Sequence, residues 1–201
     1  QPPPAMPITF YFPLSTFYSA AGGTLAHASH PDTAAGLLSG LSHPVSGPDH
    51  VIAMIAVGLW GAQLGKPAVW VLPVAFPIAM ALGGMMGLLG VPLPGVEIGI
   101  AASAIVLGIM VPAAARPPLW VAGVIVGVFA LFHGHAHGTE LPEGANGTLY
   151  SIGFVIATGL LHAVGIAIGL IHRWDWGRPA LRTAGALVAA GGAVFLYQAL
   201  A

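Results

Sequence analysis

Long apolar segments occupy most of the chain, and their length restricts the fold more than any other feature. A helix needs roughly 20 apolar residues to cross a hydrocarbon core about 30 Å thick. The connections between the segments are short, and 5% of the residues are charged, whereas a soluble domain carries about 25%. The sequence therefore predicts an all-α, polytopic membrane helix bundle with about six transmembrane helices, at residues 34–64, 68–90, 96–114, 118–138, 148–171 and 180–200.

The first of these segments, residues 34–64, contains residues that oppose a continuous helix. Pro44 and Pro48 each remove a backbone donor and restrict the preceding residue, and Gly47 lies between them. Irregular backbone at membrane depth is tolerated only where it is packed in protein or lines a cavity. We therefore expect a broken first span, with its break inside the bundle.

The basic residues are confined to alternate connections between the predicted spans. The connections at 91–95 and 139–147 contain no lysine or arginine. The positive-inside rule assigns the basic side to the cytoplasm, which places the mature N-terminus outside. The basic residues are Lys66, Arg116, Arg173, Arg178 and Arg182.

Residues 1–26 permit two interpretations. Met6 to Ala26 is apolar and ends in a small-residue pattern typical of signal-peptide cleavage. The segment has no basic residue at its start, however, and its prolines oppose a regular helix. We expect either an export signal or an external arm at 1–26, followed by a single six-span transmembrane domain at 27–201.

Charge and cysteine content exclude several classes of protein. The formal net charge is -1, so we expect no basic surface for nucleic acid. The absence of cysteine excludes disulfide scaffolds, iron–sulfur clusters and thiolate zinc sites. The glycines at Gly83, Gly84 and Gly87 are not followed by the lysine of a nucleotide-binding loop, so they predict close helix contact instead of an ATPase site.

The histidines and carboxylates of the spans are predicted to gather in the outer half of the membrane. Ionisable residues inside spans are costly and are candidates for functional sites. The predicted orientation brings the polar part of the first span, the start of the third and the end of the fourth to one side. The residues that we predict to form a metal site there are His43, Asp49, His50, Glu97, His133, His137 and Glu140.

Helical spacing indicates which of these side chains share a face. His43 and His50 are seven residues apart, and His133 and His137 are four apart. His135 points elsewhere in a regular helix and is a weaker candidate for an ion pathway. His162, alone in the fifth span, is explained equally well by an interhelical hydrogen bond and by a place in the pathway.

The ligand types limit the ion without identifying it. Imidazole and carboxylate without thiolate suit nickel, cobalt, zinc or manganese. Structural roles remain open for the same residues. The first-span group would cap a broken helix, Glu97 would be favoured at a helix N-terminus, and the fourth-span histidines would lie in water beyond the membrane.

Two long motifs resemble the signatures of a known family. They are HPVSGPDHVIAMIAVGLW at residues 43–60 and FHGHAHGTE at residues 132–140. LPGVE at 93–97 and the region around Phe76 also match, so that the similarity covers residues 30–171 in order. The chain resembles the HupE/UreJ proteins, which implies a six-span secondary permease for nickel, sometimes cobalt, in the bacterial inner membrane. The functional positions that the resemblance implies are His43, Asp49, His50, Phe76, Glu97, His137 and Glu140.

We therefore predict a permease and not an enzyme, with Ni²⁺ (or Co²⁺ or Zn²⁺) as the transported ion, the lipid bilayer as surroundings and no resident cofactor. A membrane potential contributes about 2.3 kcal/mol per charge per 100 mV, which favours inward movement of a dication. Two alternatives stay open, and the sequence does not indicate the oligomeric state. One alternative is an intramembrane zinc hydrolase with Ser42 and Ser46 near the cluster, and the other is a haem-binding membrane cytochrome.

Overall fold

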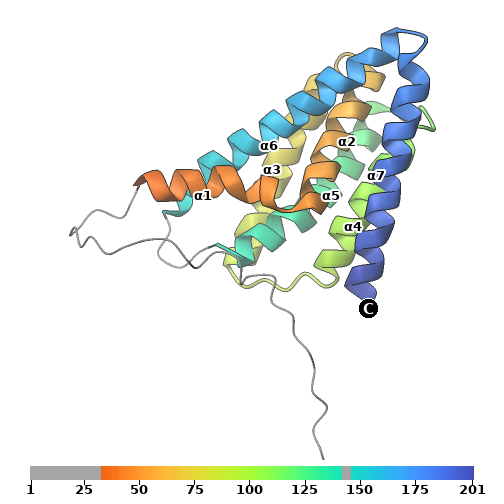
Figure 1. Cartoon of the computed structure of the whole chain (residues 1–201). Helices are drawn as coiled ribbons and strands as arrows, with labels where there is room; N and C mark the ends of the chain where they lie inside the picture. The colour runs from red at the N-terminus through yellow and green to blue at the C-terminus, as the bar shows by residue number, and fades with distance from the viewer. Residues whose placement is uncertain (1–32, 142–145) are drawn as a thin grey trace, which may run out of the picture. The chain divides into compact units, whose positions relative to one another are not determined.

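The protein is helical throughout residues 33–141 and 146–201, which are the residues described by a computed structural model (Figure 1). No strand occurs in these two ranges, and the predicted all-α membrane bundle is confirmed. The predicted signal or arm at 1–26 lies outside the described residues. The helices are α1 (Thr33–Ser46), α2 (Pro48–Leu64), α3 (Ala68–Leu88), α4 (Val96–Met110), α5 (Leu119–Thr139), α6 (Gly147–Gly169), the short 3₁₀ helix η1 (Leu170–Arg173) and α7 (Gly177–Leu200).

The break predicted in the first span is present, and it lies at Gly47. This residue has an extended backbone, with φ -93° and ψ 105°, between the end of α1 and the start of α2. Pro48 begins α2. Its missing N–H costs nothing there, because N–H groups of the first helical turn have no intrahelical acceptor. Pro44 is accommodated inside α1. The break therefore separates His43 near the end of α1 from His50 in the first turn of α2.

The outer surface of the helices is apolar, as expected of a bundle in lipid. On α3, Trp70, Val74, Ile78 and Leu82 follow at four-residue intervals and are 63%, 60%, 62% and 52% exposed. A contiguous apolar stripe of this kind is a liability in water but is matched to hydrocarbon. α3, α5, the continuous segment from α6 through η1, and α7 are each long and apolar enough to cross a membrane.

α2 lies at the centre of the bundle. It contacts α3, α4, α6 and α7, and most of its side chains from His50 to Ala62 are buried. Around it, α3 pairs with α5 and α4 with α7, while α1 and α2 both lie along α6 (Figure 1). The N-terminal end of α2 and its C-terminal end therefore mark the two ends of the bundle interior.

Glycines allow the paired helices to approach closely, as predicted for Gly83, Gly84 and Gly87. A Cβ added at Gly83 would overlap the backbone carbonyl of Leu131 in α5, and one added at Gly134 would overlap the carbonyl of Met80 in α3. Without a hydrophobic force between helices in lipid, such close backbone contact is a main source of association. The α3–α5 pair is thereby fixed in register next to His133.

The largest differences between predicted and observed boundaries occur in two helices. The helix of the predicted 96–114 span ends at Met110, since Pro112 cannot donate to the preceding turn. The last helix begins at Gly177, earlier than predicted, because Pro179 lies in the first turn, where N–H groups lack intrahelical partners. These shifts leave the predicted order of the spans unchanged.

Candidate metal centre

Four imidazoles from two distant segments meet beside the break between α1 and α2. We call His43, His50, His133 and His137 the histidine cluster. His50 Nδ1 lies 2.9 Å from His133 Nδ1 and 3.3 Å from His137 Nε2. The rings of His43 and His137 have centroids 4.7 Å apart. The end of α5 thus lies against the break, because α5 presents His133 and His137 one turn apart on a single face.

The cluster extends from the surface into the bundle interior. Glu140, which ends α5, is exposed, and its Oε2 lies 3.3 Å from Nε2 of His43. The His43 side chain is 25% exposed, whereas His50 is 3% exposed and His133 is completely buried. A solute that reaches Glu140 from outside would therefore meet His43 and His137 before His50.

Two buried ring nitrogens in the cluster have no hydrogen-bond partner among the described residues. They are His50 Nε2 and His137 Nδ1. An unsatisfied buried polar group costs about 1–3 kcal/mol. A neutral imidazole nitrogen with a free lone pair is also the form that binds a metal ion. The cluster therefore carries unsatisfied groups of the type a metal site requires.

His43, His137 and Glu140 have the spacing of a three-ligand group. Each offers one ligand atom, and the three atoms lie within 4.8 Å of one another. Nitrogen and oxygen ligands bind zinc at about 2.0–2.2 Å, so ligands on one such ion are separated by about 3–4 Å. A small inward movement of these side chains would close the group around an ion.

Ser103 of α4 fixes the orientation of the deepest imidazole. Its hydroxyl donates to the backbone carbonyl of Ile100 at 2.6 Å, so it can only accept at the 2.9 Å contact with His133 Nε2. His133 then carries its proton on Nε2 and accepts at Nδ1 from His50. This assignment follows from the hydrogen-bond network. It leaves His50 Nε2 as a free lone pair, which is one of the unpartnered atoms.

His133 differs in one respect from the ligand role predicted for it. Both of its ring nitrogens are engaged, one with Ser103 and one with His50. In this arrangement His133 orients His50 and offers no free nitrogen of its own. This division of roles could not be predicted from the sequence, because Ser103 is an isolated serine in an apolar helix.

Two phenylalanines enclose the cluster. The ring of Phe154 in α6 has its centroid 4.4 Å from that of His137 and 5.6 Å from that of His50. Phe76 of α3 is fully buried, with its ring centroid 5.7 Å from His133 and 5.4 Å from His162. Phe76 therefore contacts both the deepest imidazole of the cluster and His162. The sequence motifs indicated Phe76 but not Phe154, which lies outside both motifs.

Three other predicted residues lie at the edge of the cluster or apart from it. Asp49 Oδ1 accepts a 2.8 Å hydrogen bond from the backbone N–H of His50, in the first turn of α2. Glu97 is exposed in the first turn of α4, within electrostatic range of Asp49 and Glu140. His135 lies apart from the cluster, as its helical position predicts, and Nε2 hydrogen-bonds the carbonyl of Val91 at 2.8 Å.

His162 lies deeper in the bundle and has no hydrogen-bond partner among the described residues. It is 1% exposed, and both of its ring nitrogens are unpaired. His162 faces the backbone carbonyl of Pro73 in α3, which Pro77 leaves without an intrahelical donor, so an interhelical role stays open beside a place in the pathway. The Phe76 ring contacts both His162 and His133, so His162 lies next to the buried side of the cluster.

The residues of the cluster come from the two motifs at 43–60 and 132–140. The sequence profile of the HupE / UreJ proteins matches residues 15–195. The chain belongs to the HupE/UreJ family. Protein HupE of Rhizobium leguminosarum bv. viciae is 45% identical over 182 residues, which make up 90% of this chain and 95% of that protein. No solved structure matches the chain.

Membership confirms the resemblance inferred from residues 30–171 and extends it toward both ends of the chain. HupE/UreJ proteins are membrane accessory proteins of hydrogenase and urease, so the chain is a membrane protein of this group. Within it, the first HupE/UreJ motif forms the helix break with two imidazoles. The second motif supplies the other two imidazoles and Glu140.

Proposed function

We propose that this HupE/UreJ protein is a secondary permease that moves a divalent transition-metal ion, nickel first and cobalt second, across the bacterial inner membrane into the cytoplasm. The observation that carries the proposal is the histidine cluster at a broken helix, with Glu140 at its exposed side. Ionisable groups are retained inside membrane spans where they serve ion pathways.

Exposure falls from Glu140 to His133, which supports entry of the ion at the Glu140 end of the cluster. Glu140 and His43 would capture the hydrated ion, and imidazoles of His137 and His50 would then replace its water. Asp49 and Glu97 would add negative charge nearby, which lowers the cost of a dication close to hydrocarbon. A transport site must also release its ion, so ligands that only partly converge suit a permease better than a storage site.

The path beyond the cluster is closed by apolar side chains. Phe76, Met54, Leu72 and Leu107 are fully buried, or nearly so, in the core around α2. We propose that movement of Phe76 opens the way from the cluster to His162, whose free nitrogens would hold the ion next. Inward movement of a dication is favoured by a potential that contributes about 2.3 kcal/mol per charge per 100 mV.

The hydrolase alternative has no observation in its favour. Ser42 and Ser46, the nearest candidates for a nucleophile, each donate their hydroxyl to a backbone carbonyl three residues earlier in α1. Among the described residues, neither hydroxyl is hydrogen-bonded to a histidine that could activate it. We therefore retain the permease as the single proposed function.

Metal uptake into sealed vesicles that contain the purified protein tests this function. We expect nickel to enter faster than in protein-free vesicles, with cobalt next and with zinc and manganese slower. An inside-negative potential should increase the rate, because the cargo is a dication. If none of the four ions enters faster than in protein-free vesicles, under either potential, the permease proposal is wrong.

Ser103→Ala is expected to lower nickel affinity by about 10–100-fold, the usual effect of losing a group that orients a metal-binding imidazole. The substitution removes the acceptor of His133 Nε2, so His133 no longer holds His50 in the orientation that leaves the His50 Nε2 lone pair free. Isothermal titration of the purified protein measures the change. Ser151→Ala is the matched control, because the Ser151 hydroxyl bonds only the carbonyl of Gly147, on an exposed part of α6. Equal affinities in the two variants would contradict the proposed role.

A further inference from the structure

A second polar site lies at the other end of the bundle. A cavity of about 190 Å³ opens where the C-terminal end of α2, the segment after α4, η1 and the start of α7 meet. Its polar lining consists of Gln63, Arg116, His172, Arg178 and Arg182. His50 and Gln63 are separated by about 20 Å along α2, at 1.5 Å per residue. The cavity is therefore distinct from the histidine cluster.

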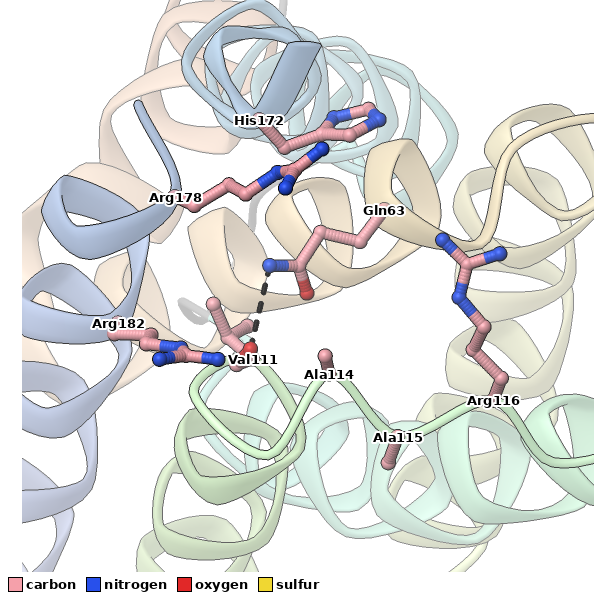
Figure 2. Close-up of a pocket in the computed structure, with 8 residues that line it drawn as sticks. All are labelled: Gln63, Val111, Ala114, Ala115, Arg116, His172, Arg178 and Arg182. Atoms are coloured by element: carbon pink, nitrogen blue, oxygen red, sulfur yellow. Dashed lines mark hydrogen bonds between the residues drawn. The ribbon is translucent and has the colours of Figure 1, made fainter. Parts of the chain in front are cut away.

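Three guanidinium groups surround this cavity without a counter-ion. Figure 2 shows Arg116 on one side and Arg178 and Arg182 on the other, with Gln63 between them. No carboxylate lines the cavity, and within 33–141 and 146–201 no ion pair involves an arginine. The Gln63 amide is held by a hydrogen bond from Nε2 to the Val111 carbonyl at 3.2 Å.

These charges repel one another, and an anion among them would relieve the repulsion. Arg178 and Arg182 are four residues apart on α7, a spacing at which like charges destabilise a helix. Both also lie near the helix N-terminus, the positive end of its dipole, where an anion is favoured and a cation is not. Arginine is the residue best suited to hold a phosphate through paired N–H donors.

The size of the cavity limits the anion. Pockets for drug-sized ligands have volumes of about 300–1,000 Å³, so this cavity fits a phosphate group better than a nucleotide. Trp174 and Trp176, in the link between η1 and α7, are stacked and are 53% and 64% exposed. Exposed tryptophans at the end of a membrane helix are typical of the headgroup region.

We propose that this cavity binds a phosphate group at the membrane surface, supplied by the headgroup of an anionic phospholipid, with free inorganic phosphate as the other source. All five basic residues of the chain lie at this end of the bundle, in the connections or at the start of α7, and three of them line the cavity. Basic pockets between transmembrane helices bind anionic headgroups in this way. The proposal is independent of metal transport.

Native mass spectrometry of the purified protein with equal amounts of phosphatidylglycerol and phosphatidylcholine tests the proposal, without any metal ion. We expect the wild type to retain phosphatidylglycerol preferentially. The double variant Arg178→Gln/Arg182→Gln should retain at least about tenfold less, because the loss of even one charge-assisted hydrogen bond to the headgroup lowers binding by about tenfold or more. Lys66→Gln/Arg173→Gln, which removes two exposed charges outside the cavity, should leave retention within about twofold, because a headgroup held in the cavity does not depend on general surface charge.

A second arm distinguishes the two sources of phosphate. If inorganic phosphate raises the unfolding temperature of the wild type but not of Arg178→Gln/Arg182→Gln, and phosphatidylglycerol is not preferred, the bound group is a soluble anion. If the double variant does not fold, Arg116→Gln replaces it, compared with Lys66→Gln. The proposal is overturned if both pairs of variants lose lipid equally, or if neither lipid nor phosphate distinguishes them.

Discussion

His50→Ala is expected to abolish nickel uptake into vesicles and to lower nickel affinity by more than about 100-fold. Loss of a residue that only orients a metal ligand lowers affinity about 10–100-fold, so loss of a ligand itself should exceed that range. His50 is the residue on which the cluster converges. It contacts His133 and His137 through Nδ1, and its Nε2 is buried without a partner.

His135→Ala provides the matched control for this variant. It removes an imidazole from the same stretch of α5 as His133 and His137. This imidazole, however, hydrogen-bonds the Val91 carbonyl and lies outside the cluster. Uptake by His135→Ala should stay within about twofold of the wild type, because the second motif places this ring away from the pathway. His43→Ala is a second test from α1, where the side chain is partly exposed and its loss leaves the core intact. Normal uptake by His50→Ala and His43→Ala would contradict the site.

Gly134→Ala is expected to destabilise the protein by about 1–3 kcal/mol, the cost of overpacking a closely packed interface. For a chain of this size, this lowers the unfolding temperature by about 2–12 °C. The added methyl group would overlap the Met80 carbonyl and force α3 and α5 apart. Since His133 adjoins Gly134, the cluster would also be displaced, and nickel affinity should fall together with stability.

The control for this substitution lies on the same helix. A Cβ at Gly123 of α5 meets nothing within 4 Å, so Gly123→Ala should leave both the unfolding temperature and nickel affinity unchanged. Thermal unfolding in detergent, followed by circular dichroism, measures both variants. Equal unfolding temperatures for Gly134→Ala and Gly123→Ala would show that the α3–α5 contact is looser than the structure has it.

The membrane bundle could be predicted from the sequence because bilayer thickness sets the length of each span. The break at Gly47 could be predicted as well, since proline and glycine have local effects that do not depend on packing. The same holds for His135, which helical periodicity separates from His133 and His137. These predictions rest on properties of one segment at a time.

Features that depend on which helices meet could not be predicted. The contact between Ser103 and His133 joins α4 to α5, and that between Phe154 and His137 joins α6 to α5. Lipid tails and the helix contacts inside the bundle are similarly apolar, so hydrophobicity does not indicate the pairing, and small residues occur in most of the spans. The positions of the basic residues in the sequence indicated orientation, whereas the cavity that the arginines line depends on how the C-terminal ends of α2 and α4 meet the start of α7.

X-ray absorption at the nickel edge, on protein loaded with one equivalent of nickel, tests the central claim most directly. We predict only nitrogen and oxygen ligands, with the scattering pattern of at least two imidazoles, and loss of that pattern in His50→Ala but not in His135→Ala. Identical spectra from the wild type and His50→Ala, or a nickel ion surrounded by oxygen alone, would show that the histidine cluster does not bind the transported ion.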